Sequence, residues 1–540
     1  MFRRTGIPTR TPDRLSYLWL VMAAASFLFY AGRWTIPLAA WLAPLFLLRF
    51  VRAQRPLPGL LIAWLVRAAV AAVTLQGILN PPGTSIGVGY FVLVVLLTLV
   101  AMLPYLADCL IAPRLQGFVA TLVFPLAYTM IEYLISHGPN GTITSLANTQ
   151  YGNLPLIQLV SVTGIWGITF LISWFAAVVN WAWEHDFAWP TVRGGGALYA
   201  GLLSVVLLGG GARLALFPPT GTTVRVAGLS ASQAAVAAYN RQLPQVTLSV
   251  LLSGTATPAD RAVARTAFAI IDDDLLNRTQ QEARAGARIV AWPEASSSGA
   301  NILDEDRPAL LQRAGAVAKQ DGIYLDMGLG VYLSDASPHP VLKDEAVLID
   351  PTGNVVWTYE KTHPAPGDPP IVPSDGKAPL ADSPYGRLGN AICFDLDFPG
   401  MVRQAGRGRA DIFLGPSDDW QALDPSHAHD AAFRAIENGF SLVRQASGGL
   451  STAVDYEGRV LAASDYYATD QQVMVADVPT HGVHTIYATI GDLFAWLCII
   501  GLVALIGLAV FESRRHPSAA TPATPLPEPQ AARSIRRSGR

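Results

Sequence analysis

The chain has 540 residues, of which 51% are hydrophobic and only 14% are charged. Soluble domains carry about 25% charged residues, so this composition indicates a chain that lies partly in a membrane. The net charge of −2, without a basic stripe interleaved with aromatic residues, argues against a nucleic-acid partner. The three cysteines form neither a disulfide framework nor a CxxC metal cluster.

Eight apolar segments are long enough to cross the ~30 Å hydrocarbon core of a bilayer. They cover residues 15–32, 35–51, 57–79, 86–106, 115–136, 155–182, 196–217 and 489–512. Seven of them precede a long polar stretch and one follows it. We therefore expect a seven-span transmembrane region at 1–217, a polar domain at 221–485, an eighth transmembrane helix at 489–512 and a tail at 513–540.

The distribution of basic residues predicts the orientation of these segments, because loops rich in Lys and Arg stay in the cytoplasm. Basic residues gather before the first segment, in every second loop and after the eighth segment, whereas the alternate loops are nearly uncharged. The residues are Arg3, Arg4, Arg10, Arg14, Arg49, Arg52, Arg55, Arg114, Arg193, Arg514 and Arg515. Both termini are thus predicted to be cytoplasmic, and the polar domain to lie outside, which in a bacterium is the periplasm.

The two ends of the chain need separate interpretation. The first apolar segment follows a basic stretch, as in a cleaved signal peptide. Removing it would reverse a charge pattern that otherwise agrees loop by loop, so we interpret it as a span. Residues 517–540 are rich in Pro, Ala and Arg without an apolar period. They are typical of a disordered tail.

Strand-like and helix-like patterns alternate through the polar domain. We expect strands at 224–229, 287–292, 324–332, 345–350, 355–359, 388–392, 410–414 and 441–445, helices at 261–285, 308–321 and 427–438, and hairpin turns at 351–354 and 455–458. Strands mixed with helices and hairpins indicate an α/β sandwich with mixed sheets. About 265 residues are ample for a full hydrophobic core.

Three residues with reactive side chains follow expected strands. Glu294 ends the run Trp292-Pro293-Glu294, Lys361 lies in Tyr359-Glu360-Lys361, and Cys393 follows Leu388–Ile392. Strand ends are where α/β folds gather catalytic groups. A carboxylate can act as a base, a lysine can stabilise an oxyanion and a thiol can act as a nucleophile. Each alone has an ordinary interpretation: a surface Glu, a solvated Lys and a buried small hydrophobe.

The order Glu294, Lys361, Cys393 in one α/β domain resembles the nitrilase superfamily. The resemblance implies an αββα sandwich, a Glu base, a catalytic Lys and a Cys nucleophile. Further residues match its pattern at Asp411, Pro416-Ser417-Asp418-Asp419-Trp420, Arg434-Ala435-Ile436-Glu437-Asn438 and Asp455-Tyr456-Glu457-Gly458-Arg459.

The eight segments around this domain extend the resemblance to nearly the whole chain, which is similar to the bacterial apolipoprotein N-acyltransferases. Supporting stretches are Tyr151-Gly152-Asn153-Leu154-Pro155, Gly164-Ile165-Trp166-Gly167 and Pro479-Thr480-His481-Gly482. The resemblance implies an inner-membrane enzyme that moves an acyl chain from a phospholipid, by way of a thioester, to the N-terminal amine of a lipoprotein. It implies no cofactor, and we expect a monomer.

Three positions depart from the acyltransferase pattern. The family's Pro-Phe-Gly-Glu-Tyr loop is Pro364-Ala365-Pro366-Gly367-Asp368 here, with Asp368 one residue out of step in place of the glutamate. The family's Cys-Tyr-Glu is Cys393-Phe394-Asp395. These changes surround the nucleophile, so they leave open a second function, that of a membrane-anchored amidase or nitrilase-type hydrolase that uses water as the acceptor.

Four further charged or metal-binding side chains are candidates for other roles. His427 and His429 have the residue type of a metal pair, but their spacing places them on different faces of a helix. We interpret them as a polar helix entrance. Arg67 and Glu132 lie within apolar segments, where ionisable residues are usually functional. They could pair with each other or contact a lipid headgroup.

Overall fold

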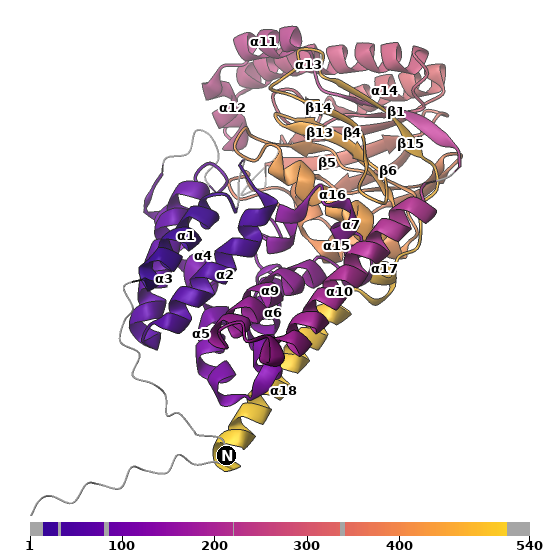
Figure 1. Ribbon diagram of the computed structural model, residues 1–540. Coiled ribbons are helices and arrows are strands. Elements are labelled where there is room, and N and C mark those ends of the chain that lie inside the picture. Colours follow the sequence, from indigo (N-terminus) through magenta and orange to yellow (C-terminus); the bar gives the residue numbers. More distant parts are fainter. Residues whose placement is uncertain (1–14, 31–33, 80–85, 220, 335–340, 516–540) are drawn as a thin grey trace, which may run out of the picture.

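The computed structural model describes residues 15–30, 34–79, 86–219, 221–334 and 341–515. An apolar helical region comes first, an α/β domain follows it, and one apolar helix ends the described chain (Figure 1). The predicted tail at 517–540 lies outside these residues, as do the basic residues before residue 15.

Within the described residues, six segments are long and apolar enough to cross a membrane, five before the α/β domain and one after it. They are α3 (Pro56–Thr74), the run Val88–Arg114 with α4 (Val88–Val100) and α5 (Leu103–Ile111), the run Gly117–Ile135 with α6 (Val123–Ile135), α9 (Trp166–Glu184), α10 (Trp189–Leu216) and α18 (Leu493–Arg515). In α10 only three of 28 residues are buried, as expected for a helix that faces lipid.

The first two expected spans are shorter helices, so the count of seven spans before the α/β domain is not confirmed. Helix α1 (Ser16–Leu28) has 13 residues, and α2 (Pro37–Ala53) has 17 residues with Pro44 in its interior. The sixth expected span also begins late. Gly164 adopts φ +64°, so residues 154–163 form the short helices α7 (Leu154–Ile157) and α8 (Val160–Thr163) before α9 starts at Trp166.

Two mixed sheets form the centre of the α/β domain. The first has the order β15-β1-β2-β4-β5-β6, with β3 beside β4, and the second has the order β14-β13-β11-β9-β8-β7. The strands of the first sheet are β15 (Val473–Pro479), β1 (Thr223–Leu229), β2 (Ile289–Ala291), β4 (Tyr324–Tyr332), β5 (Leu342–Ile349), β6 (Val355–Glu360) and β3 (Ala300–Leu303). Those of the second are β14 (Val460–Asp465), β13 (Leu450–Val454), β11 (Ser441–Arg444), β9 (Ile412–Leu414), β8 (Gly386–Asn390) and β7 (Leu380–Ser383).

The alternation of side chains along each strand produces the layers. On β4, Tyr324 points into the core shared with Leu388 and Phe413 of the second sheet, whereas Leu325 points into the core beneath Phe268 of helix α13. The outer helices of the first sheet are α11 (Gln233–Gln242), α12 (Gln245–Leu252), α13 (Pro258–Arg284) and α14 (Arg307–Asp321). On the second sheet they are α15 (Pro399–Arg407) and α16 (Ser426–Asn438), with the short α17 (Ile486–Ile490) beside them. The result is helix–sheet–sheet–helix layering.

Helix α16 lies between the second sheet and the apolar helices (Figure 1). Its residues Phe433 and Ile436 belong to the same buried cluster as Trp166 of α9. Glu437 of α16 accepts a hydrogen bond from the backbone N–H of Ile165 at 2.9 Å. Thr142 donates from both its N–H and its hydroxyl to the carbonyl oxygen of Asp397, each at 2.9 Å. These contacts fix the α/β domain on the membrane region.

Candidate active site

Glu294, Lys361 and Cys393 lie at the ends of three different strands and line one cavity of about 200 Å³. Glu294 comes three residues after β2, Lys361 follows β6 directly, and Cys393 comes three residues after β8. The first two strands belong to one sheet and β8 to the other. The cavity therefore sits where the two sheets meet at one edge.

Glu294 and Lys361 form a buried ion pair. The Lys361 ammonium donates to Glu294 Oε1 at 2.6 Å, and the side chains are 2% and 6% exposed. Glu294 Oε2 accepts a second hydrogen bond from the backbone N–H of Asp418 at 2.8 Å. Both carboxylate oxygens are thus held, and the carboxylate has a fixed position in the cavity.

Two further acids surround the same ammonium group. Lys361 Nζ lies 3.0 Å from Asp368 and 3.5 Å from Asp344. Burial lowers the pKa of Lys361, but the carboxylates of Glu294, Asp344 and Asp368 outweigh it and raise that pKa well above its usual value. Burial, followed by the charge of Glu294, raises the pKa of Asp344 well above its usual value. Lys361 therefore stays charged, while Asp344 favours its neutral form.

Cys393 occupies a strained position at the start of a 3-10 turn, Cys393–Asp397. Its φ of +44° lies in the left-handed region, which non-glycine residues rarely adopt. Its N–H donates to the carbonyl of Pro416 at 2.9 Å, and its thiol donates to the carbonyl of Asp418 at 3.4 Å. Burial and then Glu294 raise the pKa of the thiol well above its usual value. The resting group is therefore the thiol, which needs a base to become a nucleophile.

Asp395 connects the nucleophile turn with the segment that carries Lys361. Its side chain is fully buried, and it accepts hydrogen bonds from the hydroxyl of Tyr359 at 2.6 Å and the N–H of His363 at 2.8 Å. It also accepts from the N–H of Thr362 and, within its own turn, from the N–H of Ile392. Asp395 therefore fixes the two strand ends relative to each other without lining the cavity.

Phe394 and Asp368 line the cavity itself. Phe394 is buried and packs edge-on against Phe398, with ring centroids 5.5 Å apart. Asp368 is 31% exposed and also accepts from the N–H of Ala365 at 2.7 Å, which closes the loop that covers Lys361. The sequence predicted both residues near the nucleophile, and both line the cavity that holds it.

Sequence reasoning assigned no role to Asp344, Asp419 or Arg444, and it placed His427 at the polar entrance of a helix. Helix α16 does begin there, at Ser426, but the side chain of His427 is buried beside the nucleophile. The run Asp418-Asp419-Trp420 was a usable signal for Asp419. The prediction that His427 and His429 face different ways holds, because His429 stacks on Tyr151.

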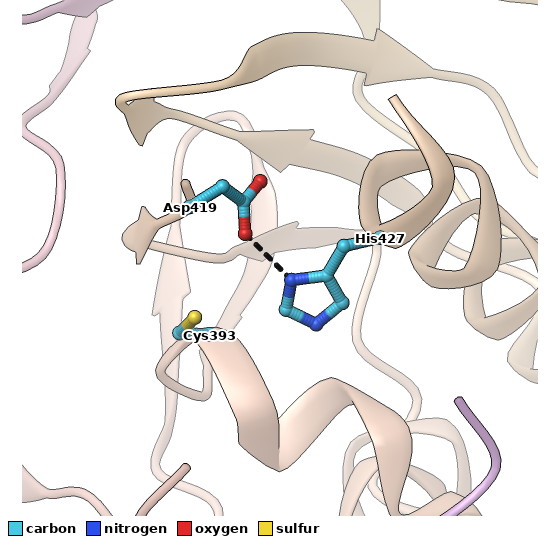
Figure 2. A group of neighbouring side chains, drawn as sticks. All are labelled: Cys393, Asp419 and His427. Carbon is cyan, nitrogen blue, oxygen red and sulfur yellow. Dashed lines mark hydrogen bonds and ion pairs between the residues drawn. The ribbon is translucent and has the colours of Figure 1, made fainter. Parts of the chain in front are cut away.

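Cys393, Asp419 and His427 have the residue types of a metal site, and one ligand atom from each lies within 4.8 Å of the others (Figure 2). However, both ring nitrogens of His427 already face carboxylate oxygens, those of Asp419 and Asp397, at 2.7 Å. Arg444 also donates to both oxygens of Asp419 at 2.8 Å. A guanidinium in this position repels a cation, so we interpret the group as an ion-pair network and assign no metal to it.

The membrane region forms part of the cavity wall. Ile78 and Leu79, which follow α3, and Asn140 and Ile143 line the cavity together with the catalytic candidates. The indole N–H of Trp420 donates to the carbonyl of Gly77 in the same segment. The cavity thus has an apolar wall supplied by the segment that follows an apolar helix.

Arg67 and Glu132 line a separate cavity among the apolar helices. The described side chains show no ion pair between them. Glu132 instead accepts hydrogen bonds from Ser145 at 3.0 Å, the N–H of Leu146 at 2.9 Å and Thr169 at 2.7 Å. The guanidinium of Arg67 lies 4.8 Å from the ring centre of Phe27.

Comparison with known proteins gives matches in both halves of the chain. A model of the apolipoprotein N-acyltransferase N-terminal domain matches residues 18–178, and a carbon-nitrogen hydrolase model matches residues 273–487. The apolipoprotein N-acyltransferase of Geobacter metallireducens is 25% identical over 464 residues, which cover 79% of this chain and 81% of that protein. The same enzyme of Bradyrhizobium diazoefficiens is 25% identical over 432 residues, which cover 74% and 75%.

Two amidases are similar over shorter parts of the chain. A deaminated glutathione amidase of Dictyostelium discoideum is 30% identical over 190 residues, which cover 31% of this chain and 64% of that protein. Among solved structures, an amidase from Nesterenkonia sp. is 19% identical, covering 52% of this chain and 97% of its own, with a TM-score of 0.36.

Proposed function

Because the chain belongs to the apolipoprotein N-acyltransferase family, we propose that it transfers a fatty acyl chain from a membrane phospholipid to a lipoprotein. The acceptor is the N-terminal amine of an S-diacylglyceryl-cysteine, and the acyl chain passes through a thioester on Cys393. One observation carries this proposal. The cavity that holds Cys393, Glu294 and Lys361 has a wall made by Ile78 and Leu79, in the segment that follows the apolar helix α3. A lipid ester can therefore reach the thiol from the bilayer.

In the first half-reaction, Glu294 takes the proton of the thiol as the sulfur attacks the carbonyl carbon of the phospholipid ester. The carbonyl oxygen becomes an oxyanion next to the Lys361 ammonium and the backbone N–H of Phe394. Such a preorganised contact is often worth about 3–4 kcal/mol. The carbon–oxygen bond then breaks, and the lysophospholipid alkoxide takes the proton from Glu294. The acyl chain stays on the sulfur.

In the second half-reaction, the lipoprotein ammonium loses one proton to Glu294 and becomes a nucleophilic amine. Its nitrogen attacks the thioester carbon, the carbon–sulfur bond breaks, and the second amine proton goes to the sulfur. The proton on Glu294 passes to solvent, which restores the starting enzyme. Water would hydrolyse the thioester, so the buried position of Cys393, 4% exposed, protects the intermediate.

We also propose that the α/β domain faces the periplasm and that both termini are cytoplasmic. The long apolar segments before the domain number five, and α1 and α2 would make seven. Both numbers are odd, so the predicted side of the domain does not depend on whether that pair crosses. A cysteine placed at the exposed position of Ser253 should react with a membrane-impermeant maleimide in cells whose outer membrane is permeabilised. Labelling only after the inner membrane is lysed would reverse the assignment.

The test of the function is intact-protein mass spectrometry of the purified chain after incubation with phospholipid. We expect a fatty-acyl mass increment on the wild type, its removal by a diacylglyceryl-cysteine peptide, and no increment on Cys393→Ala. Cys498→Ala, which removes another buried cysteine in α18, is the matched control and should still be acylated. An unmodified wild type that hydrolyses small amides would move the assignment to the hydrolase, the alternative that the amidase similarity favours.

A further inference from the structure

His427 is enclosed beside the nucleophile, although no step of the proposed reaction uses it. The side chain lies on α16, is 2% exposed and lines the cavity that holds Cys393. Its Nδ1 lies 2.7 Å from Asp419 and its Nε2 lies 2.7 Å from Asp397, so the ring joins two carboxylates (Figure 2 shows the bond to Asp419). These two contacts hold the buried ring in one orientation.

The hydrogen bonds indicate the charge of the ring. An ionised carboxylate can only accept, so the two short contacts to carboxylates favour a hydrogen on both ring nitrogens. The guanidinium of Arg444 lies 3.0 Å from Nδ1 and opposes the charge on the ring, an effect smaller than that of the two carboxylates. Burial lowers the pKa of His427, but Asp397 and Asp419 outweigh it and raise that pKa to about 10. Burial alone would raise the pKa of Asp419, yet Arg444 and His427 lower it well below its usual value. The ring is therefore an imidazolium between two anions at neutral pH.

The two carboxylates belong to the backbone segments that hold the reacting groups. Asp397 ends the 3-10 turn that begins at Cys393. Asp419 follows Asp418, whose N–H holds Glu294 at 2.8 Å and whose carbonyl accepts from the Cys393 thiol at 3.4 Å. His427 is thus the side chain that links the nucleophile turn to the segment that holds the base.

The charges of the four side chains in this group sum to zero beside the sulfur of Cys393. Asp397 and Asp419 carry two negative charges, and His427 and Arg444 carry two positive charges. One ligand atom each of His427 and Asp419 lies within 4.8 Å of Cys393 Sγ. A neutral residue at position 427 would leave one uncompensated negative charge at this distance. A like charge within about 4–6 Å raises the pKa of an acid by about 1–3 units.

We propose that His427 is a positioning residue of the acyl transfer, which clamps the nucleophile turn to the segment holding the base and neutralises the buried carboxylates beside the sulfur. The assignment rests on the proposed role of Cys393 as the nucleophile. The other charged groups that face the sulfur are Glu294, Lys361 and Arg444, with Asp418 and Asp419 on the adjacent segment. Asp430 faces the ring from its own helix. These groups stay the same in the variants below.

The experiment measures the reactivity of the thiol rather than the transfer, so its outcome is independent of whether lipid is the donor. The full chain in detergent is alkylated with iodoacetamide from pH 6 to 11, and the Cys393 peptide is quantified by mass spectrometry. In His427→Gln we expect the apparent pKa of the thiol to rise by about 1–2 units and the alkylation rate at pH 7.5 to fall about 10- to 100-fold. If His427 only filled space, the pH dependence of Cys393 alkylation would be the same in the variant as in the wild type.

Charge balance provides the decisive control. The double variant Asp397→Asn with His427→Gln removes one anion and one cation, so the thiol profile should return to within about 0.5 unit of the wild type. The single variant Asp397→Asn leaves an excess cation and should lower the apparent pKa, a result obtainable even if His427→Gln fails to fold. Unchanged or raised values in Asp397→Asn, or a double variant that stays shifted like His427→Gln, would overturn the proposal.

Discussion

The carboxylate of Asp395 accepts a hydrogen bond from the backbone N–H of His363 at 2.8 Å, which ties the turn of the nucleophile to the segment following Lys361. The two residues follow strands β8 and β6, which belong to different sheets, and 32 positions separate them in the chain. The relative placement of sulfur and ammonium therefore depends on one buried carboxylate that touches neither substrate nor sulfur.

Asp395→Asn should slow acylation of the enzyme while the protein stays folded. The variant replaces one acceptor oxygen with an NH₂ group that faces donors, and hydrogen bonds to charged groups contribute about 1.5–3 kcal/mol. We expect acyl-enzyme formation to fall about 10- to 100-fold in a single-turnover assay by mass spectrometry. Asp375→Asn, an exposed aspartate of the neighbouring loop, is the matched control. Equal rates for the two variants would remove Asp395 from the positioning of the site.

Removing either partner of the buried pair should destabilise the protein, and the loss of Lys361 should cost more stability than the loss of Glu294. Lys361→Met leaves Glu294 and Asp368 without their cation, whereas Glu294→Gln leaves Lys361 with Asp368. Breaking a buried pair costs about 3–5 kcal/mol. We expect the apparent melting temperature in detergent to fall further for Lys361→Met than for Glu294→Gln.

Lys377→Met provides the surface control for this comparison. Lys377 pairs with Asp375, and both side chains are exposed, so its loss should leave the melting temperature almost unchanged. If Lys361→Met melted no lower than Lys377→Met, the ammonium would contribute nothing to holding the three acids together.

The sequence predicted the parts of the fold that depend on local patterns. The alternation in residues 324–332 and the turn at 351–354 correspond to β4 and to the β5–β6 hairpin. Helices α11 and α12 were missed, because short helices depend on packing, here against α13, more than on their own sequence. Two of the expected spans are short, because apolar composition does not measure where a hydrogen-bonded helix begins and ends.

The sequence likewise predicted some residues of the candidate site and not others. Glu294, Lys361 and Cys393 could be located because each follows a strand, and strand ends meet at an edge of the fold. Asp344 could not, because Lys343-Asp344-Glu345 has the pattern of a solvated strand edge. The burial and charge of His427 could not be predicted for a related reason. Its charge and burial come from Asp397 and Asp419, and only the folded chain brings these acids to the ring.

Glu132→Gln should lower stability through the contacts between helices. Glu132 joins α6 to Ser145 and Leu146 of the following loop and to Thr169 of α9. The glutamine can keep its carbonyl oxygen toward the N–H of Leu146 and its NH₂ toward the two hydroxyls, but it lacks the charge of the carboxylate, with a loss of about 1 kcal/mol. We expect a melting temperature several degrees below that of Glu184→Gln, a half-exposed glutamate of α9. Equal melting temperatures would show that the three hydrogen bonds carry no stability.

The last prediction concerns the pH dependence of stability, and its sign follows from His427. The pKa of this ring is raised from 6.5 to about 10, because Asp397 and Asp419 outweigh the effect of burial. A raised histidine pKa adds stability that is fully present below about pH 6.5 and is lost as the pH rises toward 10. Other groups titrate in the same window, such as Asp326, whose pKa burial raises to about 8. The difference between the wild type and His427→Gln isolates the ring. The melting temperatures of the wild type and His427→Gln should therefore converge as the pH rises from 6 to 10. A difference that stays constant over this range would show that the ring is neutral in the folded protein.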